Sequence, residues 1–331
     1  MAYTDIDKPS DYFNTKLYTG TGSSNAVTGV GFEPSFTWIK NRGGTNFHNL
    51  YDVIRGATKT LDSATTAAES TSGSGLTAWG SDGFTVVSDG DVNASSNPYV
   101  SWNWKETATA GFDIVSYTGD GSEGRNISHS LSAVPAMMII KNRSGTTNWI
   151  VYHHKNTSAP ATEHLKLNLT DATADDDSTW DDTAPTSSVF RIKSSSSVNG
   201  NGSNYIAYLF AEKKGYSKFG SYIGNGNVDG SFIWTGQKSA FVMVKRSSGT
   251  GHWMMLDNKR SASGGFNVLG ERLKANANDA GATDVYMDFL SNGFKLRNTA
   301  TSWNASGSTY IYMAFAENPF VTSTGVPATA R

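Results

Sequence analysis

A short basic run recurs three times along this 331-residue chain, each time after an apolar segment and a few residues before an aromatic side chain. Basic groups beside an exposed aromatic ring can hold a sugar or an anionic glycan through stacking and charge-assisted hydrogen bonds. The alternative, which the recurrence of the pattern favours, is that the basic residues leave a core strand at a turn and the ring is buried. The candidate ligand-binding residues are Lys40, Arg42 and Phe47, then Lys141, Arg143 and Trp149, then Lys245, Arg246 and Trp253.

Carboxylates recur as well, but their pattern does not predict an active site. Glu106, Glu212 and Glu317 each follow a matching apolar segment and stand beside a lysine or an asparagine. A glycosidase needs two carboxylates roughly 5–10 Å apart around its sugar, whereas one carboxylate repeated in the same place is typical of a turn or of an ion pair with lysine. No serine stands in a Gly-x-Ser-x-Gly motif. We therefore predict a non-enzymatic protein with no catalytic residues.

Two groups carry side chains that can ligate metals. His153 and His154 are adjacent, so on a strand they point to opposite faces and cannot readily share one ion. Asp175, Asp177 and Asp181 could bind Ca²⁺, which takes several oxygen ligands. A solvated acidic loop explains the same three residues and is favoured. We predict no cofactor and no metal site.

Composition narrows the class of protein. The 27 Lys and Arg residues against 29 Asp and Glu residues give a net charge of −2, which is not the basic excess of a nucleic-acid-binding protein. With no cysteine, the chain has neither disulfides nor thiolate metal sites. No apolar run approaches the roughly 18 residues that span a bilayer, and the polar start lacks the pattern of a secretory signal. We expect no nucleic-acid partner, no membrane insertion and no secretion signal.

Four landmarks recur in one order along the chain. They are a Gly-x-Gly turn after a tyrosine, the basic run, the aromatic residue and a closing apolar segment. Lys40 and Lys141 are 101 residues apart, and Lys141 and Lys245 are 104 apart. This period is too long for most solenoid repeats, which run roughly 20–50 residues, and it is the size of a small domain.

The landmarks predict three repeats. The predicted parts are an N-terminal attachment segment at 1–12, repeat 1 at 13–108, repeat 2 at 112–214, repeat 3 at 217–320 and a C-terminal tail at 321–331. Because the joins are short, we expect the repeats to pack on one another. The small, polar, proline-containing tail is expected to be extended.

Within a repeat, the sequence favours short strands. Residues 310–316 alternate with apolar or aromatic side chains on both faces, which suits a central strand covered on both sides. Ser81–Phe84 and Ser291–Phe294 are hairpin signals whose x-Gly pair suits a type I′ turn. The best helical candidate is 267–276, with Leu269 and Leu273 four residues apart. The predicted fold is all-β, with three tandem β-sandwich (jelly-roll-like) modules of about 100 residues.

Several motifs of this chain are shared with a known group of proteins. They are the start Met1–Pro9, the run Glu33–Arg42, Ser81–Phe84, the trio Tyr99, Trp102 and Trp104, and the ending Ala314–Phe320. Through these motifs the chain resembles an uncharacterised repeat-domain family of marine tailed-phage virion proteins, often described as concanavalin-A-like. The resemblance implies a virion-associated protein that is made in the host cytoplasm, and it brings no catalytic residues.

Three functions follow from this resemblance. The first is a particle-surface protein, such as a tail fibre, spike or appendage, that binds a host-surface glycan. The second is a capsid decoration or cement protein with a purely structural role, and the third is a glycan depolymerase. In the first two cases the expected partners are other virion proteins of the tail or capsid, and the chain is expected to form a homo-oligomer, with a trimer favoured. If a ligand is bound, we expect one or two repeats to bind it and the others to act as scaffold.

Overall fold

The computed structural model describes residues 3–260 and 268–328, and its regular secondary structure is almost entirely β-strand, which confirms the predicted all-β fold class. Three antiparallel main sheets account for most of the strands. The first has the order β1 (Phe13–Thr19), β9 (Pro98–Trp104), β3 (Phe36–Asn41) and β4 (Asn49–Asp52). The second has the order β10 (Phe112–Thr118), β17 (Asn204–Phe210), β12 (Met137–Asn142), β13 (Ile150–His153), β14 (Glu163–Lys166) and β15 (Ala174–Asp175). The third has the order β18 (Ser217–Ile223), β25 (Thr309–Pro319), β20 (Gln237–Arg246), β21 (Met254–Asp257), β22 (Val268–Lys274), β23 (Ala282–Leu290), β24 (Gly293–Leu296) and β19 (Phe232–Trp234).

Each main sheet repeats one pattern of pairing. The opening strand pairs with the closing strand, which pairs with the strand that carries the basic run, which in turn pairs with the next strand along the chain. The closing strands β9, β17 and β25 therefore lie inside their sheets, as their two apolar faces predict. In β25, every residue from Tyr310 to Ala316 is buried.

Smaller sheets accompany the main sheets of repeats 1 and 2, whereas in repeat 3 strands β23, β24 and β19 continue the main sheet itself, and the sections are β-sandwich-like. The smaller sheets are β2 (Asn25–Thr28) with β8 (Gly83–Val86) and β7 (Leu76–Gly80), β11 (Arg125–Ser128) with β16 (Val189–Ile192), and β5 (Lys59–Thr60) with β6 (Ser70–Thr71). Both predicted hairpins are present, as β7–β8 and β23–β24. Their glycines lie one residue after the two-residue turns, and a Cβ on Gly83 would come within 1.9 Å of the Val27 carbonyl oxygen. These glycines do not form the turns themselves. They allow a neighbouring strand to approach closely, as β2 approaches β8 at Gly83.

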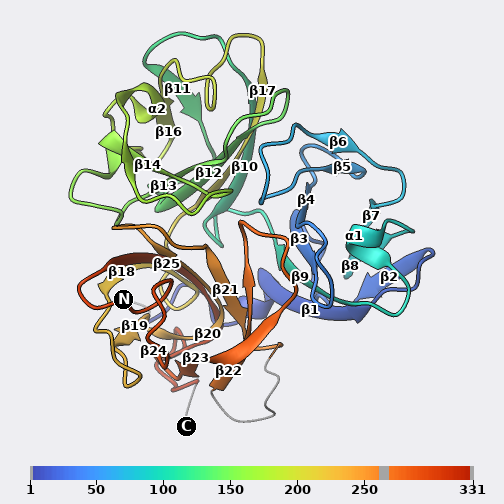
Figure 1. The fold of residues 1–331 in the computed structure, drawn as a ribbon, viewed down its shortest axis with the longest axis vertical. Helices are drawn as coiled ribbons and strands as arrows, with labels where there is room; N and C mark the ends of the chain where they lie inside the picture. Colours follow the sequence, from blue (N-terminus) through green and yellow to red (C-terminus); the bar gives the residue numbers. More distant parts are fainter. Residues whose placement is uncertain (1–2, 261–267, 329–331) are drawn as a thin grey trace.

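The three main sheets face one another around a shared core. This central core contains aromatic residues from every repeat, such as Phe36 and Trp104, Phe210, Phe241 and Phe315. Three separate outer cores lie between each main sheet and its covering strands. Figure 1 shows the arrangement, with repeat 1 in blue, repeat 2 in green and repeat 3 in yellow to red around one centre. The packing expected from the short joins is therefore present.

The Gly-x-Gly turns are held by a buried asparagine in each repeat, Asn93, Asn199 or Asn304. The Asn93 backbone carbonyl accepts the N–H of Gly22, its Oδ1 accepts the N–H of Thr21, and its amide donates to the carbonyl of Ser23. The second glycine of the turn has φ between +67° and +71° in all three copies, which favours glycine. Sequence reading noted the glycines and missed the asparagine.

Helix is confined to single turns in the described residues. These are α1 (Gly90–Asn93), α2 (Asp177–Trp180), and the 3₁₀ turns η1 (Pro9–Asp11) and η2 (Pro160–Thr162). The best helical candidate of the sequence, 267–276, contains no helix in its described part, because Val268–Lys274 forms strand β22; residue 267 lies outside the described residues.

The first and last described residues pack together beside the join between repeats 2 and 3. The backbone N–H of Asp5 donates to the carbonyl of Lys214, and Ile6 is buried in the central core. Near the other end, Thr322 and Val326 form a backbone hydrogen bond across a tight turn, so the described part of the tail is folded back and not extended. The Asp7 carboxylate accepts hydrogen bonds from the backbone and hydroxyl of Ser323, which brings the two ends together.

Candidate functional site

The three lysines of the basic runs are fully buried. The Lys141 Nζ donates to the carbonyls of Asn142 and Gly145 in its own repeat, and to that of Thr66 in repeat 1. Lys245 likewise reaches the carbonyl of Thr170 in repeat 2. Burial lowers the pKa of Lys40, Lys141 and Lys245 to about 8. The ammonium groups of Lys141 and Lys245 therefore hold loops of two repeats together, whereas that of Lys40 donates to the carbonyls of Asn41 and Gly44 in its own repeat. All three lysines are buried and do not face solvent.

Arg42 and Arg143 form ion pairs between repeats. Arg143 binds both carboxylate oxygens of Glu69 in repeat 1, at 2.9 and 3.0 Å. Arg42 binds Glu271 of repeat 3 in the same bidentate way, at 2.9 and 2.6 Å. Paired guanidinium and carboxylate groups of this geometry are the strong form of this contact.

Trp149 and Trp253 are buried, and each bridges two repeats. The Trp149 indole N–H donates to the carbonyl of Asp62, and that of Trp253 donates to the carbonyl of Lys166. In repeat 1 the matching position directly before the strand is His48, not Phe47. The His48 Nε2 lies 2.9 Å from the carbonyl of Lys274, and its Nδ1 accepts the indole N–H of Trp38. Burial lowers the pKa of His48 well below its usual value, in keeping with a neutral ring.

Repeat 3 departs from the basic pattern. In repeat 3, Lys245 Nζ donates to the carbonyl of Arg246, and in repeat 2, Lys141 Nζ donates to the carbonyl of Asn142. Arg246 is therefore the structural equivalent of Asn142. Ser247 then stands at the place of Arg143, and its carbonyl accepts the N–H of Thr173. The contact between repeats 2 and 3 therefore has serine and threonine where the contact between repeats 1 and 2 has arginine and glutamate.

A second set of contacts repeats at the ends of β4, β13 and β21. Asp52 accepts a hydrogen bond from the Tyr208 hydroxyl of repeat 2, and Asp257 accepts one from the Trp102 indole of repeat 1. Both aspartates also form buried ion pairs with an arginine three residues later. In repeat 2 the position is His153, whose Nε2 lies 3.1 Å from the carbonyl of Tyr312 in repeat 3.

The predicted ligand-binding residues therefore lie mainly at contacts between repeats. Phe47 is an exception, since its ring is half-exposed and does not share the place of the two tryptophans. The structure does not bring the nine residues into one site. The arrangement fits the structural alternative that the recurrence favoured.

The recurring glutamates make local contacts, and two of them form ion pairs with lysine. Glu212 pairs with Lys218 at 2.5 Å, and Glu317 pairs with Lys238 at 2.7 Å. Glu106 accepts the backbone N–H of Ile114. Burial, with a hydrogen bond that protonated Glu106 donates to the neighbouring Asp113 carboxylate, raises the pKa of Glu106 to about 7.

The histidine pair and the acidic loop also have local partners. His154 Nε2 lies 3.0 Å from the carbonyl of Phe219. Asp177 and Asp181 pair with Lys193, and Asp181 also pairs with Arg191. Asp175 is exposed on β15. Within 3–260 and 268–328 no group of three or more acidic or histidine side chains could hold a metal ion, and no helix of this part is long and apolar enough to cross a membrane.

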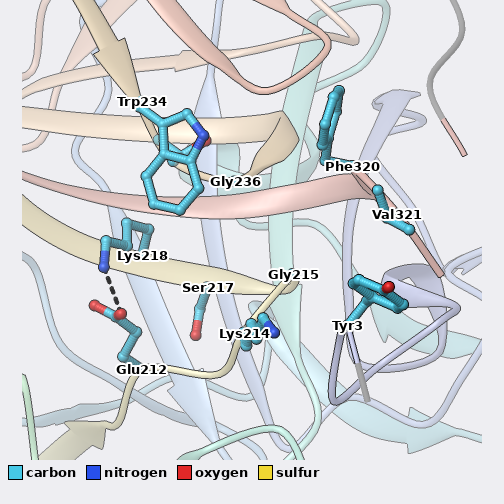
Figure 2. Close-up of a pocket in the computed structure, with 11 residues that line it drawn as sticks. Tyr3, Glu212, Lys214, Gly215, Ser217, Lys218, Trp234, Gly236, Phe320 and Val321 are labelled. Atoms are coloured by element: carbon cyan, nitrogen blue, oxygen red, sulfur yellow. Dashed lines mark hydrogen bonds and ion pairs between the residues drawn. The ribbon is translucent and has the colours of Figure 1, made fainter. Parts of the chain in front are cut away.

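An exposed aromatic cleft lies where the two chain ends meet repeat 3. It is a hollow of about 220 Å³ with Tyr3, Trp234 and Phe320 around it. These side chains are 61 %, 60 % and 40 % exposed, although large aromatic side chains are ordinarily buried. Figure 2 shows the three rings around the opening.

Polar groups lie beside these rings. The ion pair of Glu212 with Lys218 lies along one side of the cleft, with Ser217 next to it (Figure 2). The backbone at Gly236 has φ +74°, and a Cβ there would come within 3.0 Å of the Trp234 ring. Because glycine has no side chain, residue 236 makes room for the Trp234 ring.

Extra length in repeat 3 creates the cleft. Strands β20 and β25 contain 10 and 11 residues, whereas β12 and β17 of repeat 2 contain 6 and 7. The strand β19, with its outward-facing Phe232 and Trp234, follows β18. Sequence reading missed this site, although the exposed-buried-exposed pattern of 232–234 is visible in the sequence as an aromatic–isoleucine–aromatic triplet.

The fold is that of an all-β protein whose three main sheets share one core, with an aromatic cleft beside its third repeat. A protein-family model described as "Domain of unknown function (DUF7483)" matches residues 8–319, and the chain belongs to this family. No curated protein and no solved structure matches the chain.

Proposed function

We propose that this protein is a non-enzymatic component of a phage particle surface, such as a tail fibre, spike or appendage, and that its aromatic cleft binds a host-surface glycan. The observation that carries the proposal is the exposure of Trp234 beside Tyr3 and Phe320 in one hollow. Exposed aromatic groups gathered in one concave place are typical of binding sites. The assignment to a phage particle is supported by the sequence resemblance.

A sugar is the ligand class that suits this chemistry. The apolar face of a pyranose ring stacks on an indole or phenol ring, while its hydroxyls need donors and acceptors at the edge. Trp234 supplies such a face, and Glu212, Lys218 and Ser217 lie beside it. The hollow is smaller than a typical drug-sized pocket of roughly 300–1,000 Å³, so it suits one sugar unit of a longer chain.

The side chains of the cleft support binding without hydrolysis. Glu212 is the one carboxylate among its described lining residues, and it is paired with Lys218. Both mechanisms of glycoside hydrolysis use a pair of carboxylates. Sugar release from host polysaccharide by the purified protein would overturn this part of the proposal and favour the depolymerase.

A glycan array followed by calorimetric titration of the best-binding saccharide tests the proposal. We expect Trp234→Ala to weaken binding about 10-fold or more, because stacking on an aromatic side chain is worth roughly 1–2 kcal/mol. Phe47→Ala, which removes an exposed ring in repeat 1, is the matched control and should bind as the wild type does. Equal binding by the Trp234→Ala variant would contradict the assignment of the cleft.

A capsid decoration role is the second candidate, favoured by exposed apolar side chains outside the cleft. Ile223, Val228 and Phe232 are 64 %, 62 % and 44 % exposed on the segment that joins β18 to β19. Such side chains suit contact with another virion protein. Localising the protein on the particle with an antibody, and comparing adsorption with particle stability after its deletion, separates the two roles. Light scattering of the purified protein checks the predicted homotrimer.

A further inference from the structure

A second hollow, of about 710 Å³, adjoins the aromatic cleft. The two hollows share Glu212 and Lys218 in their walls, so they lie on either side of this ion pair. The second hollow lies between two repeats, with Val134 and Lys155 from repeat 2 and Gly220 from repeat 3 among its lining residues. Together they form a groove that runs from Trp234 towards Lys155.

The edge of the third main sheet forms one wall of this groove. Strand β18 is at the end of its sheet and pairs with β25 alone among the described strands. An edge strand presents backbone N–H and C=O groups that hydroxyl groups can bond. One of them, the carbonyl of Phe219, lies 3.0 Å from His154 Nε2, which ties the two walls of the groove together.

The charge of the groove differs from that of the chain. Among the described residues that line the two hollows, Lys155, Lys214 and Lys218 are basic and Glu212 is the one acid. The whole chain has a net charge of −2. Burial and the neighbouring lysines lower the pKa of His154, so this ring adds no positive charge at neutral pH. Because Lys218 is paired with Glu212, the exposed Lys155 is the residue that brings positive charge to the second hollow, and such a charge attracts anions to a concave site.

We infer that the groove binds an acidic oligosaccharide of several units, with one sugar ring stacked in the aromatic cleft and a carboxylate of a later unit at Lys155. This inference rests on the proposed function, since it extends the same site. The size of the second hollow falls within the range of ordinary ligand pockets. An exposed lysine at its far side is suited to a carboxylate that remains partly hydrated.

Titration calorimetry on the full chain tests the inference with oligogalacturonates of one, three and six units and with neutral malto-oligosaccharides of the same lengths. We expect affinity to rise with length for the acidic series, and to exceed that of the neutral hexamer. Lys155→Ala should weaken binding of the acidic hexamer about 5-fold, the effect of losing one exposed ion pair. The same variant should bind the neutral trimer as the wild type does. Lys105→Ala, which removes an exposed lysine of repeat 1, is the matched control.

The outcomes separate the inference from the proposed function. If neutral and acidic hexamers bind equally well and Lys155→Ala changes neither, the inference fails while an effect of Trp234→Ala keeps the glycan site. If a hexaglutamate peptide binds as tightly as the acidic hexamer, the groove recognises charge alone and the saccharide assignment fails. If neither series nor any saccharide of the array binds, the proposed function fails and the inference with it.

Discussion

The buried lysines show how a charged side chain can serve as a tie between loops. An ammonium group has three donors and no acceptor, and Lys141 directs its donors to the carbonyls of Thr66, Asn142 and Gly145. A buried charge is tolerated when its donors are satisfied in this way. The lysine therefore favours one arrangement of the two repeats, because a shifted loop would leave its charge without partners.

The ionisation of Glu106 opposes folding near neutral pH. Burial raises the pKa of its carboxyl group from 4.5 to about 7 in the folded protein. Between these values the folded state binds more protons than the unfolded chain, so the free energy of unfolding decreases as the pH rises through this window. Glu106→Gln removes this loss and keeps an oxygen for the N–H of Ile114.

We expect Glu106→Gln to unfold at a higher temperature than the wild type at pH 8, by about 2 °C or more, and to match it near pH 4.5. A contribution of about 1 kcal/mol allows for solvent screening of this half-buried group. Thermal unfolding followed by circular dichroism from pH 4.5 to 8 measures the difference. Glu33→Gln, at an exposed glutamate, is the control. A difference that does not vary with pH would contradict the assignment.

The limits of sequence reasoning at this scale are clear at Phe47. The recurring aromatic residue was expected at Phe47, Trp149 and Trp253, but the structural equivalent in repeat 1 is His48. Repeat 1 has the large Trp38 on the neighbouring strand, where repeat 2 has the smaller Ile139. The smaller His48 and the larger Trp149 complement these neighbours. A compensating pair of this kind can be recognised only when the packing partners are known.

At the scale of elements, β22 shows why a strand can resemble a helix in its sequence pattern. Leu269 and Leu273 are four residues apart, which suits one face of a helix. In the structure a shift of register between Leu269 and Glu271 marks a bulge at Gly270. The bulge turns the two leucines to different sides, so Leu269 is in the outer core of repeat 3 and Leu273 is in the central core. By contrast, the closing strands were predicted correctly, because a strand with two apolar faces must lie inside a sheet that is covered on both sides.

The contacts between repeats were not predictable from local pattern, and one of the three differs from the others. Glu69 with Arg143 and Glu271 with Arg42 are separated by 74 and 229 residues along the chain. At the contact between repeats 2 and 3, Thr173 stands in place of the glutamate and Ser247 in place of the arginine. A neutral pair there leaves no buried charge unpaired.

Introducing the ion pair at this contact should stabilise the protein. We expect the double variant Thr173→Glu with Ser247→Arg to be more stable than the sum of its single variants, by about 0.5–1 kcal/mol, because each charge needs the other. Denaturant unfolding of the wild type, both single variants and the double variant gives this coupling energy. The reverse cycle, Glu69→Thr with Arg143→Ser, is the matched comparison. A coupling of zero in the new pair would show that the two positions are not in register.

At the scale of the whole molecule, the repeats depend on one another. Each main sheet buries one face against its own covering strands and the other face against the other two sheets. A repeat that came apart from its neighbours would expose rings such as Phe210 and Phe241 to water, at a cost of roughly 2–3 kcal/mol for each. The shared core thus couples the stability of all three.

We therefore expect the chain to unfold in one cooperative transition, although it contains three repeats. Differential scanning calorimetry should give a calorimetric enthalpy that equals the van't Hoff enthalpy within error. Trp149→Phe, which removes the bond to Asp62 across the contact of repeats 1 and 2, should lower the temperature of the whole transition and not split it. Two or three separate transitions in the wild type would contradict the shared core as the main source of stability.

The meeting of Asp7 with Ser323 has a consequence for the connectivity of the chain. Because the last described turn lies against the first residues, a short added link could join the two ends, and the backbone could be opened instead at one of the surface joins near Thr107 or Lys213. The three sheets would keep their neighbours in such a circular permutation, since each contact between repeats is a tertiary contact that does not depend on which repeat comes first. The fold is then defined by the three contacts that join each repeat to the other two, and it does not require the chain to begin at repeat 1.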